Sequence, residues 1–235
     1  MEKQQTVVNS AVYSGIALHS GARSAVRVQP APENTGIVFR RVDLPGRPEV
    51  RALASNVVDV RRGTTIASGN AVVFTVEHIM SALNAFHIDN CIVEMDGMEP
   101  PIGDGSSLPY CRMLREAGVQ VQEAEAKVFT PASPLYVEGG HTRLVIVPGP
   151  ELRIACTTSF PGCPIDPQFY EFTATTPDAY ETEIAGGRTF VDFGALQQLL
   201  AMGLVKGGSL ELSFSAPTDD ATVRFLNALE LRPEK

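Results

Sequence analysis

The sequence predicts an α+β protein built from two domains, residues 1–125 and 126–235. Three observations support this prediction. Segments with strand and helix periodicity alternate through the first half of the chain. The stretch 121–133 (VQEAEAKVFTPAS) is polar and then turn-like, which is typical of a linker. Strand-like segments recur beyond it, and one more amphipathic helix follows.

The predicted elements follow one another in this order. In the first half we expect strands at 24–29 (SAVRVQ), 37–42 (IVFRRV) and 90–96 (NCIVEMD), and helices at 75–87 (TVEHIMSALNAFH) and 107–117 (SLPYCRMLREA). Ser106 or Ser107 is a candidate N-cap of the second helix, and Gly118 is a candidate C-terminal stop. In the second half we expect strands at 143–148 (RLVIVP) and 151–158 (ELRIACTT), a helix at 192–203 (DFGALQQLLAMG) and a hairpin tip at His141.

Composition and charge exclude several classes of protein. The chain has 235 residues, 44% hydrophobic and 20% charged, which is typical of a globular protein rather than a disordered one. A net charge of -8 argues against nucleic-acid partners and against attachment to anionic membranes by bulk charge. The sequence has no run of about eighteen apolar residues and no signal peptide, so we expect a cytoplasmic protein without a transmembrane segment. It predicts no particular oligomeric state.

The four cysteines do not indicate a structural metal site. They form no C-x-x-C pair, and no histidine lies at zinc-finger spacing from them. We therefore expect free thiols in a reducing compartment.

The segment 75–87 has a polar side that does not belong to the core. His78 lies nearly opposite the apolar stripe and Glu77 lies to its side, at about 100° per residue. His87 falls on the stripe and is expected at the core or its boundary. The stripe itself consists of Val76, Ile79, Met80, Leu83 and Phe86. From these residues alone, the polar side is either a solvent-exposed face or a functional site.

Ordered motifs along residues 1–209 favour the functional site. TVEHIMSALNAFHIDN, followed closely by EMDGMEPPIGDGSS, closely resembles the first-domain signature of the UDP-3-O-acyl-N-acetylglucosamine deacetylases. Further matches to that family are GIALHSG (15–21), PAPENTGIVFRR, RRGTT (61–65), GGRTF (186–190) and GLVKGGS (203–209). The resemblance covers nearly nine-tenths of the chain and keeps the family order of motifs.

The resemblance implies a zinc-dependent hydrolase that removes the N-acetyl group of UDP-3-O-acyl-N-acetylglucosamine, the committed step of lipid A synthesis. His78 matches the first zinc-ligating histidine, and Glu77 matches the general base. A catalytic zinc needs three protein ligands and an open position for water. The bound zinc then lowers the pKa of that water. An adjacent carboxylate can then relay a proton from the attacking water to the leaving amine.

The same resemblance implies roles for residues that bind the UDP-linked acylated glucosamine. Thr189 matches a threonine whose hydroxyl faces the oxyanion, and Phe190 matches a residue at the mouth of the acyl-chain passage. Phe160 lies where the family has an aromatic beside the nucleotide base, although its neighbours SFPGCPI depart from the usual version. Thr65, in RRGTT, and Gly208 complete the predicted substrate-binding residues.

Several of these residues also have ordinary structural interpretations. The helix 192–203 with Gly207 and Gly208 resembles the insert that forms the acyl passage, yet the two glycines also suit a simple turn. Asp104 is as suited to capping the following helix as to touching substrate. Arg61 and Arg62 suit a phosphate site or, more commonly, a solvated loop.

The resemblance stops after GGSLE (207–211). The family continues with a helix bearing H-K-x-x-D-x-x-G-D, which supplies the second zinc histidine and the zinc-ligating aspartate. Here no histidine follows His141, and Asp219 and Asp220 lie in a Pro/Thr/Asp segment without that spacing. We therefore expect one zinc ligand to be present and two to be absent.

Three expectations follow from this break. Each domain should have a sheet layer and a helical layer of similar plan, with the helical layer of the second domain incomplete. We expect a reading-frame disturbance near residue 211 with an early stop, and impaired activity. The alternative is a natural, non-catalytic paralogue that binds the acyl chain and nucleotide sugar without the metal centre.

Overall fold

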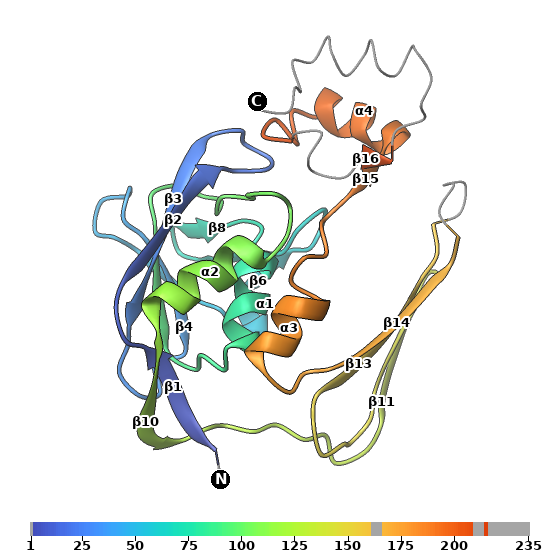
Figure 1. Ribbon diagram of the computed structural model, residues 1–235. Helices are drawn as coiled ribbons and strands as arrows, with labels where there is room; N and C mark the ends of the chain where they lie inside the picture. Colours follow the sequence, from blue (N-terminus) through green and yellow to red (C-terminus); the bar gives the residue numbers. More distant parts are fainter. Residues whose placement is uncertain (1, 161–165, 209–213, 216–235) are drawn as a thin grey trace.

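The computed structural model describes residues 2–160, 166–208 and 214–215, and it confirms an α+β fold (Figure 1). The helices are α1 (Glu77–Ala85), α2 (Leu108–Ala117), α3 (Pro177–Glu183) and α4 (Phe193–Ala201), with a 3-10 turn η1 (Ala54–Asn56). The strands before α1 are β1 (Lys3–Val7), β2 (Ala11–Ile16), β3 (Arg23–Pro30), β4 (Ile37–Arg41), β5 (Glu49–Arg51), β6 (Val57–Asp59), β7 (Thr65–Ser68) and β8 (Ala71–Val73). The later strands are β9 (Cys91–Met95), β10 (Val119–Glu125), β11 (Leu135–Gly139), β12 (Thr142–Ile146), β13 (Arg153–Thr158), β14 (Gln168–Thr173), β15 (Val191–Asp192) and β16 (Phe214–Ser215).

A five-stranded sheet in the order β2-β3-β9-β4-β5 forms one wall of the core. Its strands pair antiparallel except for β4 and β9, which run parallel. Val28 lies opposite Val93, and both side chains are fully buried. The helices α1, α2 and α3 lie on the side of the molecule that this sheet faces (Figure 1). Alternating apolar residues on the strands therefore meet the apolar stripes of the helices, as two-layer packing requires.

The segment 119–125 is a strand, so the predicted linker begins later than expected. β10 pairs antiparallel with β1, and Val7 lies opposite Val119. The partner strands are separated by more than a hundred residues, so no local pattern in VQVQEAE indicates the pairing. The physical reason for the difference is this long-range ladder, which satisfies backbone groups that a linker would expose to water.

Helix α1 begins after a residue in an unusual conformation. Thr75 has φ 53°, in the left-handed region, and the helix starts two residues later at Glu77. At the other end the helix stops at Ala85, and His87 takes φ 54°. His87 therefore leaves the helical stripe and is exposed, which corrects its expected place at the core. Residues 77–85 otherwise confirm the predicted helix, with Ile79 and Leu83 buried.

Helix α2 matches the predicted bounds closely. Ser107 is its N-cap residue, and the Leu108 N–H donates to the Ser106 hydroxyl at 3.2 Å. Pro109 occupies the first turn, where its missing N–H has no cost. Gly118 follows the helix with φ 69°, as a glycine stop predicts.

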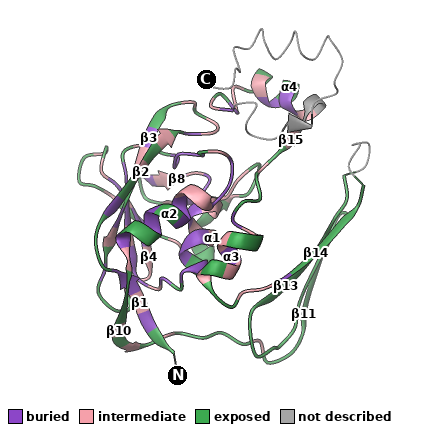
Figure 2. Cartoon of the chain, in the orientation of Figure 1, coloured by how far each residue is buried: buried purple, intermediate pink, exposed green. Residues whose placement is uncertain are grey.

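The strands β11 to β14 differ from the rest of the fold because their side chains are almost all exposed (Figure 2). β11 pairs with β12 and β13 pairs with β14, each antiparallel. The β11–β12 turn is at Gly140 and His141, which confirms the predicted hairpin tip.

Beyond these strands the chain returns to the first half. Phe172, Tyr180 and Ala185 are buried in the same apolar cluster as α1, α2 and the five-stranded sheet. Leu196, Leu199 and Val205 form a second small cluster, against which Leu18 packs. The largest described core contains residues from both sides of residue 125. The division there into two domains of similar plan stays a prediction. No helix in the described part of the chain is long and apolar enough to cross a membrane.

Candidate active site

Glu77 and His78 are the first two residues of α1, and both are half-buried. The Thr64 backbone N–H donates to Glu77 Oε2 at 3.0 Å, so the loop 61–65 fixes this carboxylate. A Cβ atom on Gly63 would lie 3.3 Å from Glu77 Oε1, which shows how closely the loop approaches. Thr65 had been predicted as the site residue of this motif, but its neighbour Thr64 makes the contact with Glu77. Thr65 lies opposite Asp59 between β6 and β7, and its role in binding substrate stays a prediction.

The His78 imidazole is held toward its neutral form. Burial lowers its pKa below the ordinary value, and the nearby charges of Glu77 and Asp104 oppose that shift only in part. A neutral imidazole is the form that binds a metal ion. The charge of Asp104 also places the 103–107 loop within electrostatic reach of His78.

The GGRTF segment docks onto the 103–107 loop. The Thr189 N–H donates to the Gly105 carbonyl oxygen at 2.8 Å, and the Ser107 N–H donates to the Ala185 carbonyl oxygen at 3.0 Å. Asp104 accepts hydrogen bonds from Ser106, at 3.1 Å from its N–H and 2.6 Å from its hydroxyl. Burial alone would raise the pKa of Asp104, but the Ser106 hydrogen bonds and the charge of Arg188 hold it below the ordinary value. Thr189 is thereby attached to the loop whose carboxylate acts on His78.

Three helices are joined behind the site by hydroxyl groups. The Tyr180 hydroxyl of α3 donates to Ser81 Oγ at 2.8 Å, and Ser81 Oγ donates to the His78 carbonyl oxygen at 2.9 Å. Ser81 Oγ also lies 2.9 Å from Ser107 Oγ, at the start of α2. This network ties the second half of the chain to the helix that carries Glu77 and His78.

Phe160 and Phe190, both predicted to bind substrate, contact each other. Their ring centroids are 5.0 Å apart, and the rings meet at 82° in an edge-to-face arrangement. Phe160 is 38% exposed and Phe190 is 42% exposed, so this aromatic pair is not part of a buried core. The two rings offer an exposed aromatic surface, and their assignment to the nucleotide base and acyl chain stays a prediction.

The segment after α4 lies against the turn that contains the GIALHSG motif. The Gly207 N–H donates to the Leu18 carbonyl oxygen at 2.9 Å, and the Gly208 N–H donates to the Val205 carbonyl oxygen at 3.0 Å. A Cβ atom on Gly207 would overlap the Ala17 carbonyl oxygen and would lie 2.7 Å from Ile16 Cγ2. Gly207 is therefore more than a flexible turn residue, because no other side chain fits this contact. Gly208 is buried beside it, and its role toward substrate stays a prediction.

Two residues near the site were not predicted from the sequence. Thr64 contacts Glu77 through its backbone, so its side chain carries no signal. Glu99 is 2% exposed and accepts hydrogen bonds from Thr75 Oγ1 at 3.0 Å and from the His19 N–H at 3.0 and 3.1 Å. Nothing in the sequence distinguishes Glu99 from its acidic neighbours Asp96 and Asp104.

The described residues do not form a complete zinc site. They contain no group of three or more histidine, cysteine, aspartate or glutamate side chains arranged to hold a metal ion. His78 has the correct donor chemistry, but a catalytic zinc takes about three protein ligands. Asp219 and Asp220 lie outside the described residues.

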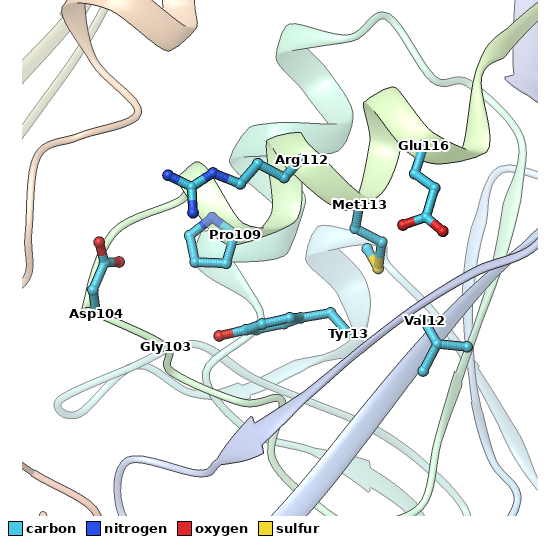
Figure 3. Close-up of a pocket in the computed structure, with 8 residues that line it drawn as sticks. All are labelled: Val12, Tyr13, Gly103, Asp104, Pro109, Arg112, Met113 and Glu116. Atoms are coloured by element: carbon cyan, nitrogen blue, oxygen red, sulfur yellow. The ribbon is translucent and has the colours of Figure 1, made fainter. Parts of the chain in front are cut away.

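A pocket of about 400 Å³ opens between β2 and α2 (Figure 3). It is lined by Val12, Tyr13, Gly103, Asp104, Pro109, Arg112, Met113 and Glu116. In Figure 3 the Arg112 side chain extends over Pro109 toward Asp104. Burial and the charge of Asp104 raise the pKa of Tyr13, while the charge of Arg112 opposes the shift. None of the residues predicted for catalysis, metal binding or substrate binding lines this pocket, but Asp104, whose charge acts on His78, does.

Comparison with known proteins agrees with the motifs. A sequence model of the UDP-3-O-acyl N-acetylglycosamine deacetylases matches residues 4–231. The chain is 38% identical to UDP-3-O-acyl-N-acetylglucosamine deacetylase of Chlamydia abortus over 208 residues, which cover 88% of this chain and 74% of that protein. It is 39% identical to the Myxococcus xanthus enzyme of that name, over 88% of this chain and 66% of that protein. It is also 37% identical to the bifunctional enzyme LpxC/FabZ of Porphyromonas gingivalis, over 90% of this chain and 46% of that protein.

Proposed function

Because the chain belongs to the UDP-3-O-acyl N-acetylglycosamine deacetylase family, we propose that it acts on the N-acetyl amide of UDP-3-O-acyl-N-acetylglucosamine in lipid A synthesis. Members of this family are hydrolases that cleave an amide. The observation that carries the proposal is the pair at the start of α1. There a carboxylate held by a backbone N–H lies next to a histidine whose pKa burial lowers.

The reaction assigns a separate task to each residue. Glu77 takes a proton from the attacking water and returns it to the leaving amine. The Thr189 hydroxyl donates to the oxyanion that forms at the amide carbon, where one donor contributes about 3 kcal/mol. His78 contributes one nitrogen donor toward the zinc ion on which the family depends.

The activity of the 235-residue chain is proposed to be low. One fact supports this: the described residues contain no group of three metal-binding side chains. One histidine with scattered carboxylates makes a weak zinc site. We therefore expect slow deacetylation, if the metal is supplied in excess, rather than the rate of a complete enzyme.

Acetate release from UDP-3-O-acyl-N-acetylglucosamine tests the proposal. The purified chain is assayed with added zinc, beside Glu77→Gln and a matched control, His87→Asn, which alters an exposed histidine outside the site. We expect Glu77→Gln to reduce the residual rate about a hundredfold and His87→Asn to leave it unchanged. A residual rate that Glu77→Gln does not alter would assign the hydrolysis to another site or to a contaminant.

A second candidate function is binding without catalysis, and the incomplete metal site favours it. The exposed Phe160–Phe190 pair would contact the nucleotide sugar or its acyl chain. Calorimetric titration with the substrate, with and without a chelator, separates the two functions. Affinity that the chelator does not change, together with no acetate release, supports the binding protein.

A further inference from the structure

We propose that Glu99 is a positioning residue that fixes the start of α1 against the turn 17–21 and, through that turn, against the segment 205–208. The proposal rests on the proposed function in one respect, namely that Glu77 and His78 form the reacting pair. Glu99 itself touches neither of these residues in the contacts that the structure describes, so it would act through the groups it holds.

The Glu99 carboxylate is buried and is fully occupied by donors. It accepts from the His19 N–H at 3.0 and 3.1 Å, from the Ser20 N–H at 3.1 Å and from Thr75 Oγ1 at 3.0 Å. None of the ion pairs found among the described residues includes it. A buried carboxylate without a cation is strongly unfavourable unless hydrogen bonds replace its water. The three donors therefore replace the water that this side chain loses on burial.

Thr75 links Glu99 to the reacting pair. Thr75 has φ 53°, and the left-handed conformation is unfavourable for a β-branched residue. Such a residue stays in place only where its surroundings hold it, and the hydrogen bond to Glu99 supplies that restraint. The next residue, Val76, donates its N–H to the Thr64 carbonyl oxygen at 3.3 Å, and Glu77 follows. The conformation of Thr75 thus sets the direction in which α1 leaves the loop.

The turn 17–21 links Glu99 to the second half of the chain. Glu99 accepts from the N–H groups of His19 and Ser20, while carbonyl oxygens of the same turn accept from the segment 205–208. The Leu18 carbonyl oxygen accepts from the Gly207 N–H at 2.9 Å, and the His19 carbonyl oxygen accepts from the Lys206 N–H at 3.4 Å. A single carboxylate therefore connects three segments that are far apart in the sequence.

The backbone of Glu99 is itself held by the five-stranded sheet. The Ser24 hydroxyl donates to the Glu99 carbonyl oxygen at 2.6 Å, and Ser24 belongs to β3 of the five-stranded sheet. The backbone that carries the carboxylate is thus attached to the sheet of the core, as a residue that positions others requires.

Two pairs of variants separate positioning from simple stability. Glu99→Gln keeps the shape: its amide oxygen can accept from the two backbone N–H groups, and its NH₂ group can donate to Thr75 Oγ1. Glu99→Leu keeps the volume but leaves all three donors unpaired. Thr75→Ser keeps the hydroxyl, whereas Thr75→Val removes it and keeps the branched shape. Glu94→Leu is the matched control, because Glu94 is also buried but pairs with Arg27 and Arg40 instead.

Hydrogen exchange of backbone amides is the measurement, because it does not require activity. In Glu99→Leu and Thr75→Val we expect exchange at the start of α1 to be about tenfold or more faster, relative to the strands β3 and β9. Glu99→Leu should also accelerate exchange at 17–21 and 205–208. Glu99→Gln and Thr75→Ser should restore the protection of the wild-type chain, and Glu94→Leu should not produce this local pattern.

The outcomes are separable from those of the proposed function. Uniform acceleration over the whole core in Glu99→Leu, or no rescue by Glu99→Gln, would overturn the positioning role. If the wild-type chain releases no acetate, the proposed function fails, yet the exchange pattern still decides the role of Glu99. If acetate is released, Glu99→Leu should reduce kcat about tenfold or more with little change in KM, and Glu99→Gln should recover it.

Discussion

The five-stranded sheet and the strands β11 to β14 have equally regular hydrogen-bonded ladders but opposite surroundings. Val26, Val28 and Val93 of the sheet are fully buried, whereas Val137 and Val145 of β11 and β12 are 62% and 58% exposed. The sheet is covered by helices, and the later strands lack such a cover among the described residues (Figure 2). The comparison teaches that strand pairing alone does not make a core, because most of the stabilisation comes from apolar area removed from water.

The same contrast divides the candidate site. Glu77 and Glu99 belong to the covered region, where hydrogen bonds hold their carboxylates, and His78 follows Glu77 on the same helix. Phe160 and Phe190 lie outside the covered sheet, are exposed and contact each other. The residues predicted for the chemistry are therefore partly or fully buried, and the two aromatic residues predicted to bind substrate are exposed.

The largest expected difference between the two regions is the cost of removing a leucine. Leu83 of α1 is 1% exposed, and Leu144 of β12 is 52% exposed. We expect Leu83→Ala to reduce the free energy of unfolding by about 2–5 kcal/mol and Leu144→Ala by about 0.5 kcal/mol or less. Urea unfolding of both variants checks this. An equal cost at Leu144 would mean that the later strands are covered in solution.

A smaller difference is expected for two glycines. A Cβ atom on Gly207 would overlap the Ala17 carbonyl oxygen, whereas one on Gly139, in β11, would meet nothing within 4 Å. Gly207→Ala should therefore destabilise the protein by about 1–3 kcal/mol, and Gly139→Ala should be nearly neutral. Thermal unfolding midpoints of the two variants test the contact between the turn 17–21 and the segment after α4. Neutral behaviour of Gly207→Ala would show that this contact is loose.

The smallest expected difference concerns acid pH. The hydrogen bond from Arg41, which is buried, lowers the pKa of Asp43 below its ordinary value of 3.8. A carboxyl group with a lowered pKa in the folded state stabilises it above the unfolded pKa, and this contribution disappears as pH falls through the folded pKa. Asp43→Asn should therefore destabilise the protein at pH 6, and its difference from the wild type should shrink as pH falls below 3.8.

The exposed strands offer the matching control for this pH effect. Hydrogen bonds from Tyr136 and Arg143 lower the pKa of Glu138, but this carboxylate is open to solvent. Glu138→Gln should therefore change the acid limb less than Asp43→Asn, and added salt should cancel its effect. Urea midpoints at pH 6 and pH 3, at low and high salt, measure both. A larger effect at Glu138 would contradict the contrast between the regions.

The local parts of the fold could be predicted from the sequence. The apolar stripe of 75–87 identified α1 and placed Ile79 and Leu83 in the core, and Gly118 marked the end of α2. Periodicity and end signals act within a few residues of chain, so a single sequence contains them. The deacetylase family was recognised for the same reason, since its motifs are short and ordered.

The non-local parts could not be predicted. The pairing of β10 with β1 and the carboxylate of Glu99 under the turn 17–21 depend on contacts between distant segments. The left-handed conformation of Thr75 is unexpected for a threonine, so no propensity indicates it. The roles of Phe160, Phe190, Thr65 and Gly208 toward substrate came from the resemblance and stay predictions.

The amount of zinc bound per chain tests the central claim most directly. That claim is the proposal that α1 presents Glu77 and His78 as the reacting pair, and that the described residues supply an incomplete metal centre. Equilibrium dialysis against micromolar zinc, followed by metal analysis, should find well under one zinc per chain, with the bound fraction reduced further in His78→Ala. One tightly bound zinc per chain, whose removal by a chelator abolishes acetate release, would contradict the account and would identify a complete deacetylase centre.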